Sequence, residues 1–175
     1  MTAEERDFAL EHLARGQQQL LDAIDGLSAE QLAYQPASGG WSIAQVVEHL
    51  ALTEEFLYGW VRNGEKAEHS GRDVEIDVKV LRAMESRKRK FGAPAGAEPT
   101  GSMSTDEALG KFLALRAETA VFVQQFGDDL RSMWTMHPVA GRVDCYTCLL
   151  MQCNHPARHA HQIAEIKQEP GFPVR

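Results

Sequence analysis

The sequence predicts an all-α protein, a four-helix bundle that forms a single domain over residues 1–175. Three observations support this fold class. Four stretches of about 20 residues carry apolar side chains at spacings of three and four, the pattern of a helix with one buried face. Polar capping residues or glycine and proline mark where these stretches begin and end. No segment shows a convincing strand pattern or an internal repeat.

The first helix is predicted from about Thr2 to Gly26. Its apolar stripe consists of Leu10, Leu13, Leu20, Leu21, Ile24 and Leu27. Ser28 then begins a short turn, with Gln31 three residues later in the pattern of a capping box. Proline and glycine in the stretch QPASGGW interrupt the chain before the next helix.

The second helix is predicted to begin at Ser42 and to end near Asn63, before Gly64. From residue 65 to residue 101 the pattern weakens, although residues 74–90 are compatible with a further helix and APAGAEPTG has the composition of a loop. Helices joined by a few residues lie antiparallel, whereas about forty residues permit a crossover. We therefore expect a long crossover between the second and third main helices.

The third and fourth main helices follow the crossover. STDEAL predicts a helix start capped by Ser104 or Thr105, with acidic residues in the first turn, and the helix continues to about Phe126. The stretch HPVAGR is interpreted as a break. The last helix is predicted to be capped by Asp144 and to end before EPGFP.

Composition restricts the class of protein. The net charge is -7, and the one basic cluster, SRKRKF, is interpreted as a solvated helix face, so nucleic-acid binding is not expected. No apolar run approaches the roughly 18 residues that cross a bilayer, so no membrane partner is expected either. The charged N-terminus and the odd number of cysteines, three, favour a cytoplasmic location.

The stretch CYTC suggests a zinc or redox site, but no second such pair accompanies it. Cys145 and Cys148 are therefore interpreted as packing residues. A thiol role near the pocket stays open for Cys148.

Three of the seven histidines lie in HPARHAHQI. His155 and His159 are four residues apart and project from nearly the same helix face, whereas His161 is about 200° away from His159 at about 100° per residue. Such a pair can bind one metal ion, and His49 in VVEHLALTE is the candidate third ligand. Alternatively, His49 is a core-edge histidine hydrogen-bonded to a neighbour. The remaining histidines are interpreted as structural or surface residues: His12, His69 and His137.

Several stretches together resemble the DinB-like superfamily, also called the DinB/YfiT group. LSAEQLAYQPASGGWSIAQVVEHLALTEE resembles its second-helix region, in which a Gly-Trp-Ser entry precedes a histidine. FGAPAGAEPTGSMSTDEAL resembles its crossover and third-helix start. HPVAGRVDCYTCLLMQCNHPARHAHQI resembles its last helix, whose signature is roughly H-x-x-R/H-H-x-x-Q-I. The resemblance covers nearly the whole chain.

The resemblance implies an up-down-down-up four-helix bundle, a homodimer, and a divalent metal held by His49, His155 and His159. Arg158 and Gln162 match other positions of the signature. Together with Thr53 and Gln152, which are suitably aligned on their helices, they are candidate pocket or second-shell residues of the metal site.

Three imidazoles suit zinc or nickel, with iron as a further candidate, and they leave a coordination position open, as in catalytic sites. Some DinB-like proteins are thiol-dependent S-transferases or isomerases that use mycothiol, bacillithiol or glutathione, and others are described as metal-dependent hydrolases. The resemblance therefore implies a metal-dependent transferase or hydrolase that acts on a small molecule. The alternative is a non-catalytic metal-binding or stress-response bundle.

Pro156 departs from a regular helix. A proline inside a helix removes a backbone hydrogen bond at a cost of about 3 kcal/mol. We therefore expect the last helix either to kink at Pro156 or to restart there, with Asn154 or His155 as its cap. Either change would move His155 relative to His159 and would weaken or remove the metal site.

Overall fold

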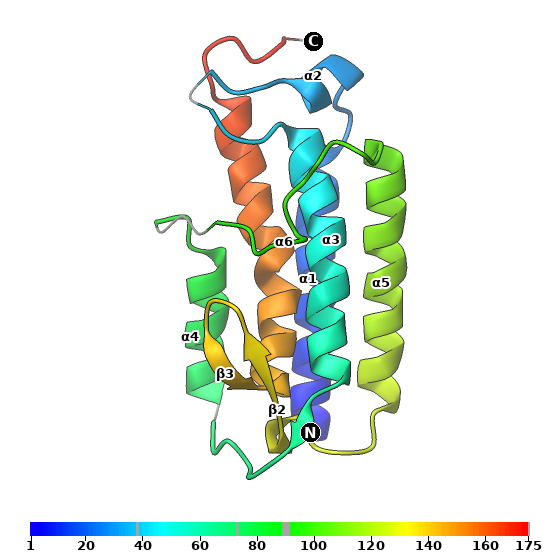
Figure 1. Cartoon of the computed structure of the whole chain (residues 1–175), viewed down its shortest axis with the longest axis vertical. Coiled ribbons are helices and arrows are strands. Elements are labelled where there is room, and N and C mark those ends of the chain that lie inside the picture. The colour runs from blue at the N-terminus through cyan, green and yellow to red at the C-terminus, as the bar shows by residue number, and fades with distance from the viewer. Residues whose placement is uncertain (38, 73, 89–91, 175) are drawn as a thin grey trace.

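The computed structural model describes residues 1–37, 39–72, 74–88 and 92–174 (Figure 1). Its elements in chain order are α1 (Ala3–Ile24), α2 (Ala29–Ala33), α3 (Ile43–Arg62), β1 (Glu65–Lys66), α4 (Val74–Glu85), α5 (Thr105–Gln125), a 3-10 turn η1 (Leu130–Ser132), β2 (Met133–His137), β3 (Gly141–Asp144) and α6 (Cys145–Lys167). Residues 89–91 of the basic cluster lie outside the described residues.

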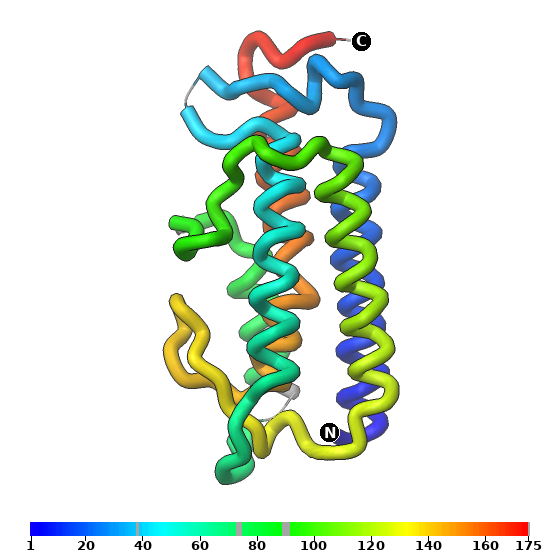
Figure 2. Tube along the Cα trace, turned by 45° about the vertical axis from the view of Figure 1, so that its right-hand side comes forward, coloured from blue at the N-terminus to red at the C-terminus, as the bar shows by residue number. Residues whose placement is uncertain are grey.

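The long helices α1, α3, α5 and α6 lie side by side along the molecule, and α4 packs against α6 (Figure 1). Viewed from the side, α1 and α6 run toward the end that carries the C-terminus, while α3 and α5 run the opposite way (Figure 2). The chain between α4 and α5 passes in front of α3 to reach the start of α5 (Figure 2). This segment is the last part of the long connection, from about residue 65 to residue 101, that was predicted as a crossover, and it brings residues 92–101 to the side of α3.

The helix starts follow from local hydrogen bonds. Each capping box combines a hydroxyl that accepts the N3 backbone N–H with an N3 side chain that accepts the cap N–H. Four such boxes are present, at Thr2, Ser28, Ser42 and Ser104. Asp144 caps α6 by accepting the Thr147 N–H at 2.8 Å. The predicted caps at Ser28, Ser42 and Asp144 are confirmed, and the choice left open for the third main helix resolves to Ser104.

The expectation that the chain lacks strands was wrong. Strands β1, β2 and β3 form a small antiparallel sheet in that order, with Trp134 opposite Asp144 and His137 opposite Gly141. The HPVAGR stretch is the turn of the β2–β3 hairpin, closed by Gly141 at φ 72°. The strands are too short to show a clear alternation of apolar and polar residues, so periodicity alone does not find them.

Helix α6 continues through Pro156 and does not restart at Asn154 or His155. Proline leaves the carbonyl of the residue four positions earlier without its usual donor. That carbonyl, on Gln152, accepts a hydrogen bond from the Arg116 guanidinium at 3.0 Å. A side chain of α5 therefore replaces the backbone bond that Pro156 removes.

The core has an apolar half at each end of the bundle and a polar layer between them. One apolar cluster includes Leu13 and Leu57, and the other includes Leu20 and Leu50. Between these levels lie buried polar side chains that bond to one another: Glu54, Arg116, Thr119 and Gln152. The same mid-bundle level of α3 and α6 carries the histidines considered next.

Candidate metal centre

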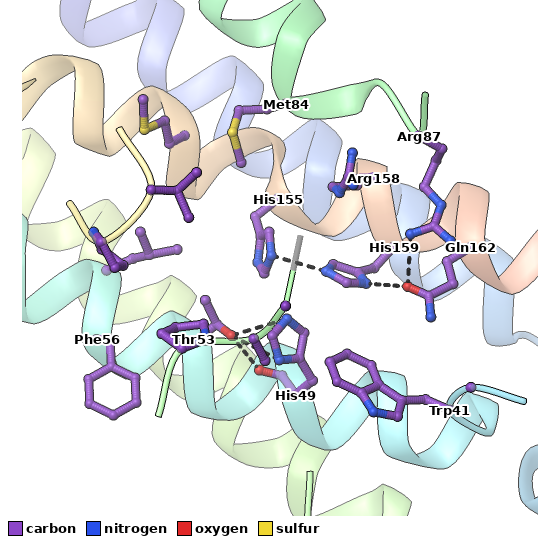
Figure 3. Close-up of a pocket in the computed structure, with 18 of the residues that line it drawn as sticks. Trp41, His49, Thr53, Phe56, Met84, Arg87, His155, Arg158, His159 and Gln162 are labelled. Carbon is purple, nitrogen blue, oxygen red and sulfur yellow. Dashed lines mark hydrogen bonds between the residues drawn. The ribbon is translucent and has the colours of Figure 1, made fainter. Parts of the chain in front are cut away.

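Three histidines from two helices meet at the middle of the bundle (Figure 3). His49 lies on α3, and His155 and His159 lie one turn apart on α6. One nitrogen from each ring lies within 4.8 Å of the others. The Nε2 atoms of His155 and His159 are 3.0 Å apart, close to the distance of about 3.3 Å between two nitrogens bound to one tetrahedral zinc.

The ring of His49 is fixed by the crossover. Its Nδ1 donates a hydrogen bond to the Ala97 carbonyl at 2.6 Å, which leaves Nε2 free of a proton in the neutral ring. The Thr53 hydroxyl donates to the His49 carbonyl at 2.7 Å. Trp41 lies against the ring, with centroids 4.7 Å apart. His49 is thus hydrogen-bonded to a neighbour, as the alternative interpretation proposed, and its Nε2 still has a lone pair available for a metal.

Glu48 anchors the loop that supplies this carbonyl. Its carboxylate accepts the Gly101 N–H at 2.7 Å and both the N–H and the hydroxyl of Ser102 at 3.2 Å, and the Thr100 hydroxyl also donates to it. Burial raises the pKa of Glu48, but these hydrogen bonds outweigh it and hold the pKa below its ordinary value. Glu48 therefore stays ionised and fastens the crossover to α3 beside His49.

The ring of His159 is oriented by a chain of hydrogen bonds through Gln162. Its Nδ1 donates to the Gln162 Oε1 at 2.9 Å, and the same oxygen accepts a hydrogen bond from Arg87 at 3.2 Å (Figure 3). Arg87 also forms a salt bridge with Glu165 at 2.9 Å. Because Nδ1 of His159 carries the proton, its Nε2 is an acceptor and faces the other rings.

His155 lacks such an anchor. Its Nε2 donates to His159 Nε2, and its buried Nδ1 has no hydrogen-bond partner among the described residues. Two of the three rings are therefore oriented by acceptors on Nδ1, whereas the hydrogen bond of His155 runs from its Nε2 to His159.

The charge state also fits a metal. Burial lowers the pKa of His49, and it lowers the pKa values of His155 and His159 well below the ordinary histidine value. The neighbouring His49 ring lowers the pKa values of His155 and His159 further, and His159 does the same to His155. The neutral imidazole is the form that binds a metal. A donor set of three imidazoles suits zinc, nickel, iron or copper. The residues present therefore fit the metal that the resemblance implies.

The histidines open onto a cavity of about 470 Å³, within the range of small-molecule sites. Of the four predicted pocket residues, Thr53, Arg158 and Gln162 line it. Gln152 does not, because its amide bonds to Glu54 at 2.8 Å and to Thr119 at 3.0 Å in the polar layer.

The cysteines are packing residues. Cys145, Cys148 and Cys153 are fully buried, and burial raises the pKa of Cys145 to about 11 and that of Cys153 to about 12. Burial likewise raises the pKa of Cys148. None of them is among the described residues that line the cavity.

Sequence reasoning missed several residues of this site. Arg87 lies just beyond α4, in a region of weak pattern, and His137 was interpreted as structural or surface although it lines the cavity. Trp41 belongs to the Gly-Trp-Ser entry of α3, so its position in the motif was a usable signal. The role of Ala97 had no signal, because a backbone carbonyl is invisible in the choice of side chain.

The chain is similar to known proteins along most of its length. The family model described as the DinB superfamily matches residues 12–163. The uncharacterized protein YuaE of Bacillus subtilis (strain 168) is 26% identical over 148 residues, which cover 83% of this chain and 89% of YuaE. The solved structure of YfiT from Bacillus subtilis matches with a TM-score of 0.64 and 17% identity, covering 96% of this chain and 89% of YfiT. YfiT is described as a probable metal-dependent hydrolase with an unusual four-helix bundle topology.

Proposed function

The chain belongs to the DinB superfamily, and from this membership we propose that it is a metal-dependent enzyme in which His49, His155 and His159 bind one divalent metal ion. One observation carries the proposal. Three neutral imidazoles point their ring nitrogens at one another at the wall of a cavity, and two of them are oriented through Nδ1. Acceptors on Nδ1 are the usual means by which a protein orients metal-binding histidines.

When bound, the metal supplies a Lewis acid that acidifies water or a thiol and polarises a carbonyl. The protein's own residues orient the ligands and limit the access of water. Ala97 and Gln162 hold two ligands in the tautomer that leaves Nε2 available. Arg87 fixes Gln162 from the other side. The apolar wall formed by Trp41 limits the access of water to His49, which strengthens the electrostatic interactions of a bound polar group.

We infer a small-molecule substrate and one of two reaction classes, hydrolysis or transfer to a thiol. The description of YfiT as a probable metal-dependent hydrolase supports the first class. The burial of all three cysteines supports an external nucleophile, because their raised pKa values leave no thiolate at neutral pH. That nucleophile is water in a hydrolase and a low-molecular-weight thiol, such as mycothiol, bacillithiol or glutathione, in an S-transferase.

The experiment that tests the proposal compares metal-loaded and chelator-treated protein. Zinc, nickel and iron forms are each given a panel of esters and amides, and separately an electrophile such as chlorodinitrobenzene with each thiol. Turnover that needs both the metal and His159 supports the proposal of an enzyme. Turnover of the esters or amides identifies a hydrolase, and turnover of the electrophile with a thiol identifies an S-transferase. Tight metal binding with no turnover in any panel contradicts the proposal and favours the non-catalytic metal-binding alternative.

Three finer inferences belong to the same proposal. We infer the up-down-down-up connectivity, a homodimer and a cytoplasmic location. Among the described helices, none combines the length and the hydrophobicity that a membrane crossing requires. Sedimentation equilibrium of the purified protein tests the dimer, and a mass equal to that of one chain contradicts it.

A further inference from the structure

The cavity extends well beyond the histidines along α3. His49 and Trp60 are eleven residues apart on this helix, which is about 16 Å along its axis. We use the term hairpin arm for the part of the cavity that reaches toward the β2–β3 hairpin. Its lining side chains include Phe56, Leu57, Trp60, Met84, Val139 and Met151.

The hairpin arm is apolar and rich in aromatic rings. Phe56 and Trp60 are stacked with centroids 6.2 Å apart, and Trp60 meets His137 edge-on at 5.5 Å. Behind them, Leu57 and Met151 belong to the buried core cluster. The floor of the arm is therefore rigid core, and its wall is a ready surface for stacking.

The rim of the arm exposes apolar side chains to solvent. Phe56 is 37% exposed and Val139, at the tip of the hairpin, is 53% exposed. Both side chains line the cavity, so their exposed apolar surface is available to an apolar ligand there. A ligand seated in the arm would remove both side chains from water.

Charge is distributed unevenly in the cavity. Arg87, Arg158 and Glu165 line it near the histidines of α6. By contrast, His137 is the one titratable side chain among the described residues that line the arm, and burial lowers its pKa, so it is neutral at physiological pH. The cavity therefore has a polar end, which suits a polar reacting group, and an apolar end, which does not.

We propose that the hairpin arm binds an aromatic or bulky apolar group of the substrate, so that the polar group to be transformed lies at His49, His155 and His159. The identity of the reacting end rests on the proposed function. The arm itself does not, because no metal or catalysis is needed for an apolar group to bind there. The substrate class is therefore a small molecule with an apolar, preferably aromatic, body and a compact polar reacting group.

The test uses the neutral fluorescent probe N-phenyl-1-naphthylamine on the full chain without added metal. Val139→Asp places a charge at the rim of the arm. Val121→Asp is the matched control, because Val121 is 48% exposed on α5 and does not line the cavity. We expect about one probe per chain, about tenfold weaker binding in Val139→Asp, and parent-like binding in the control. Circular dichroism is used to check that both variants are folded.

Equal probe affinity in the two variants, or no saturable binding by the parent, overturns the inference. A second measurement links the arm to the histidines in the zinc-loaded protein. There, 2-naphthohydroxamic acid should displace the probe at concentrations at which acetohydroxamic acid does not, and Val139→Asp should remove the difference. If zinc does not bind, the proposed function fails while the result with metal-free protein still decides the inference about the arm.

Discussion

Arg116 is the residue that we expect to be least replaceable in the bundle. Its side chain is 1% exposed, and the guanidinium donates to Glu54 at 3.3 Å and to the carbonyls of Gln152 at 3.0 Å and Cys153 at 3.3 Å. Arg116→Met keeps an unbranched chain but removes every one of these donors. The change leaves the Glu54 carboxylate buried and unpaired, and it leaves the Gln152 carbonyl without a donor because Pro156 has no N–H.

The magnitude follows from these contacts. Removing one partner of a buried ion pair costs about 3–5 kcal/mol of unfolding free energy, and an orphaned buried carbonyl adds about 1–3 kcal/mol. Burial already raises the pKa of Glu54 despite Arg116, so the unpaired carboxyl would take up a proton and recover part of the loss. We therefore expect Arg116→Met to lose about 4 kcal/mol, which is a large part of the stability of an ordinary domain.

A double substitution separates the two contributions. Glu54→Leu with Arg116→Met removes the unpaired charge but keeps the orphaned carbonyl of Gln152. The side-chain amide of Gln152 loses Glu54 as an acceptor and still donates to Thr119. Adding Pro156→Ala then restores a backbone donor to that carbonyl.

Urea unfolding of the matched set, followed by circular dichroism, measures each free energy of unfolding. We expect Pro156→Ala to stabilise the double variant by about 1 kcal/mol more than it stabilises the parent. An equal effect in both backgrounds would refute the claim that Arg116 compensates for the proline.

Three further outcomes are expected. Glu48→Ala should weaken zinc binding about tenfold, measured by competition with a chelating dye, because the loop that carries the acceptor of His49 loses its anchor. The control Glu107→Ala, which removes a capping carboxylate on α5, should leave the zinc affinity unchanged. Gly16→Ala should lower the free energy of unfolding, measured in urea, by about 1–3 kcal/mol because its Cβ would lie 2.1 Å from the Cys153 carbonyl oxygen. Gly110→Ala, with nothing within 4 Å, should raise it by about 0.5–1 kcal/mol, and the same sign for both would contradict the close packing of α1 on α6. Zinc at a hundredfold excess over its dissociation constant should add about 2.7 kcal/mol to the unfolding free energy. The effect should appear as a rise in melting temperature that a chelator reverses, and an unchanged melting temperature would argue against binding to the folded state.

Much of the fold could be predicted because helix signals are local. The hydroxyl caps at Ser28 and Ser42 and the acidic cap at Asp144 act within one turn of their own helix, so the sequence contains all the information that they need. The strands β2 and β3 depend on pairing with each other and with β1, sixty-odd residues earlier. Their stability is therefore not encoded in any single window of sequence.

The candidate site likewise has residues that the sequence could predict and residues that it could not. The juxtaposition of His155 and His159 follows from helix geometry, and the resemblance added His49 from another helix. The carbonyl of Ala97 and the guanidinium of Arg87 reach the site from the crossover region, whose path depends on tertiary packing. The predicted restart of the last helix at Pro156 was wrong for the same reason, since Arg116, which supplies the replacement donor, is forty residues away in the chain.

The central claim, that the three histidines form one metal site, is tested most directly by the metal content of the purified protein. Mass spectrometry of the parent is compared with His49→Ala and His159→Ala, with His161→Ala as control because His161 is exposed on the same helix. The account predicts about one equivalent of metal in the parent and in the control, and little in the other two variants. Metal-free parent protein after reconstitution with zinc and nickel, or metal retained in both His49→Ala and His159→Ala, would contradict it.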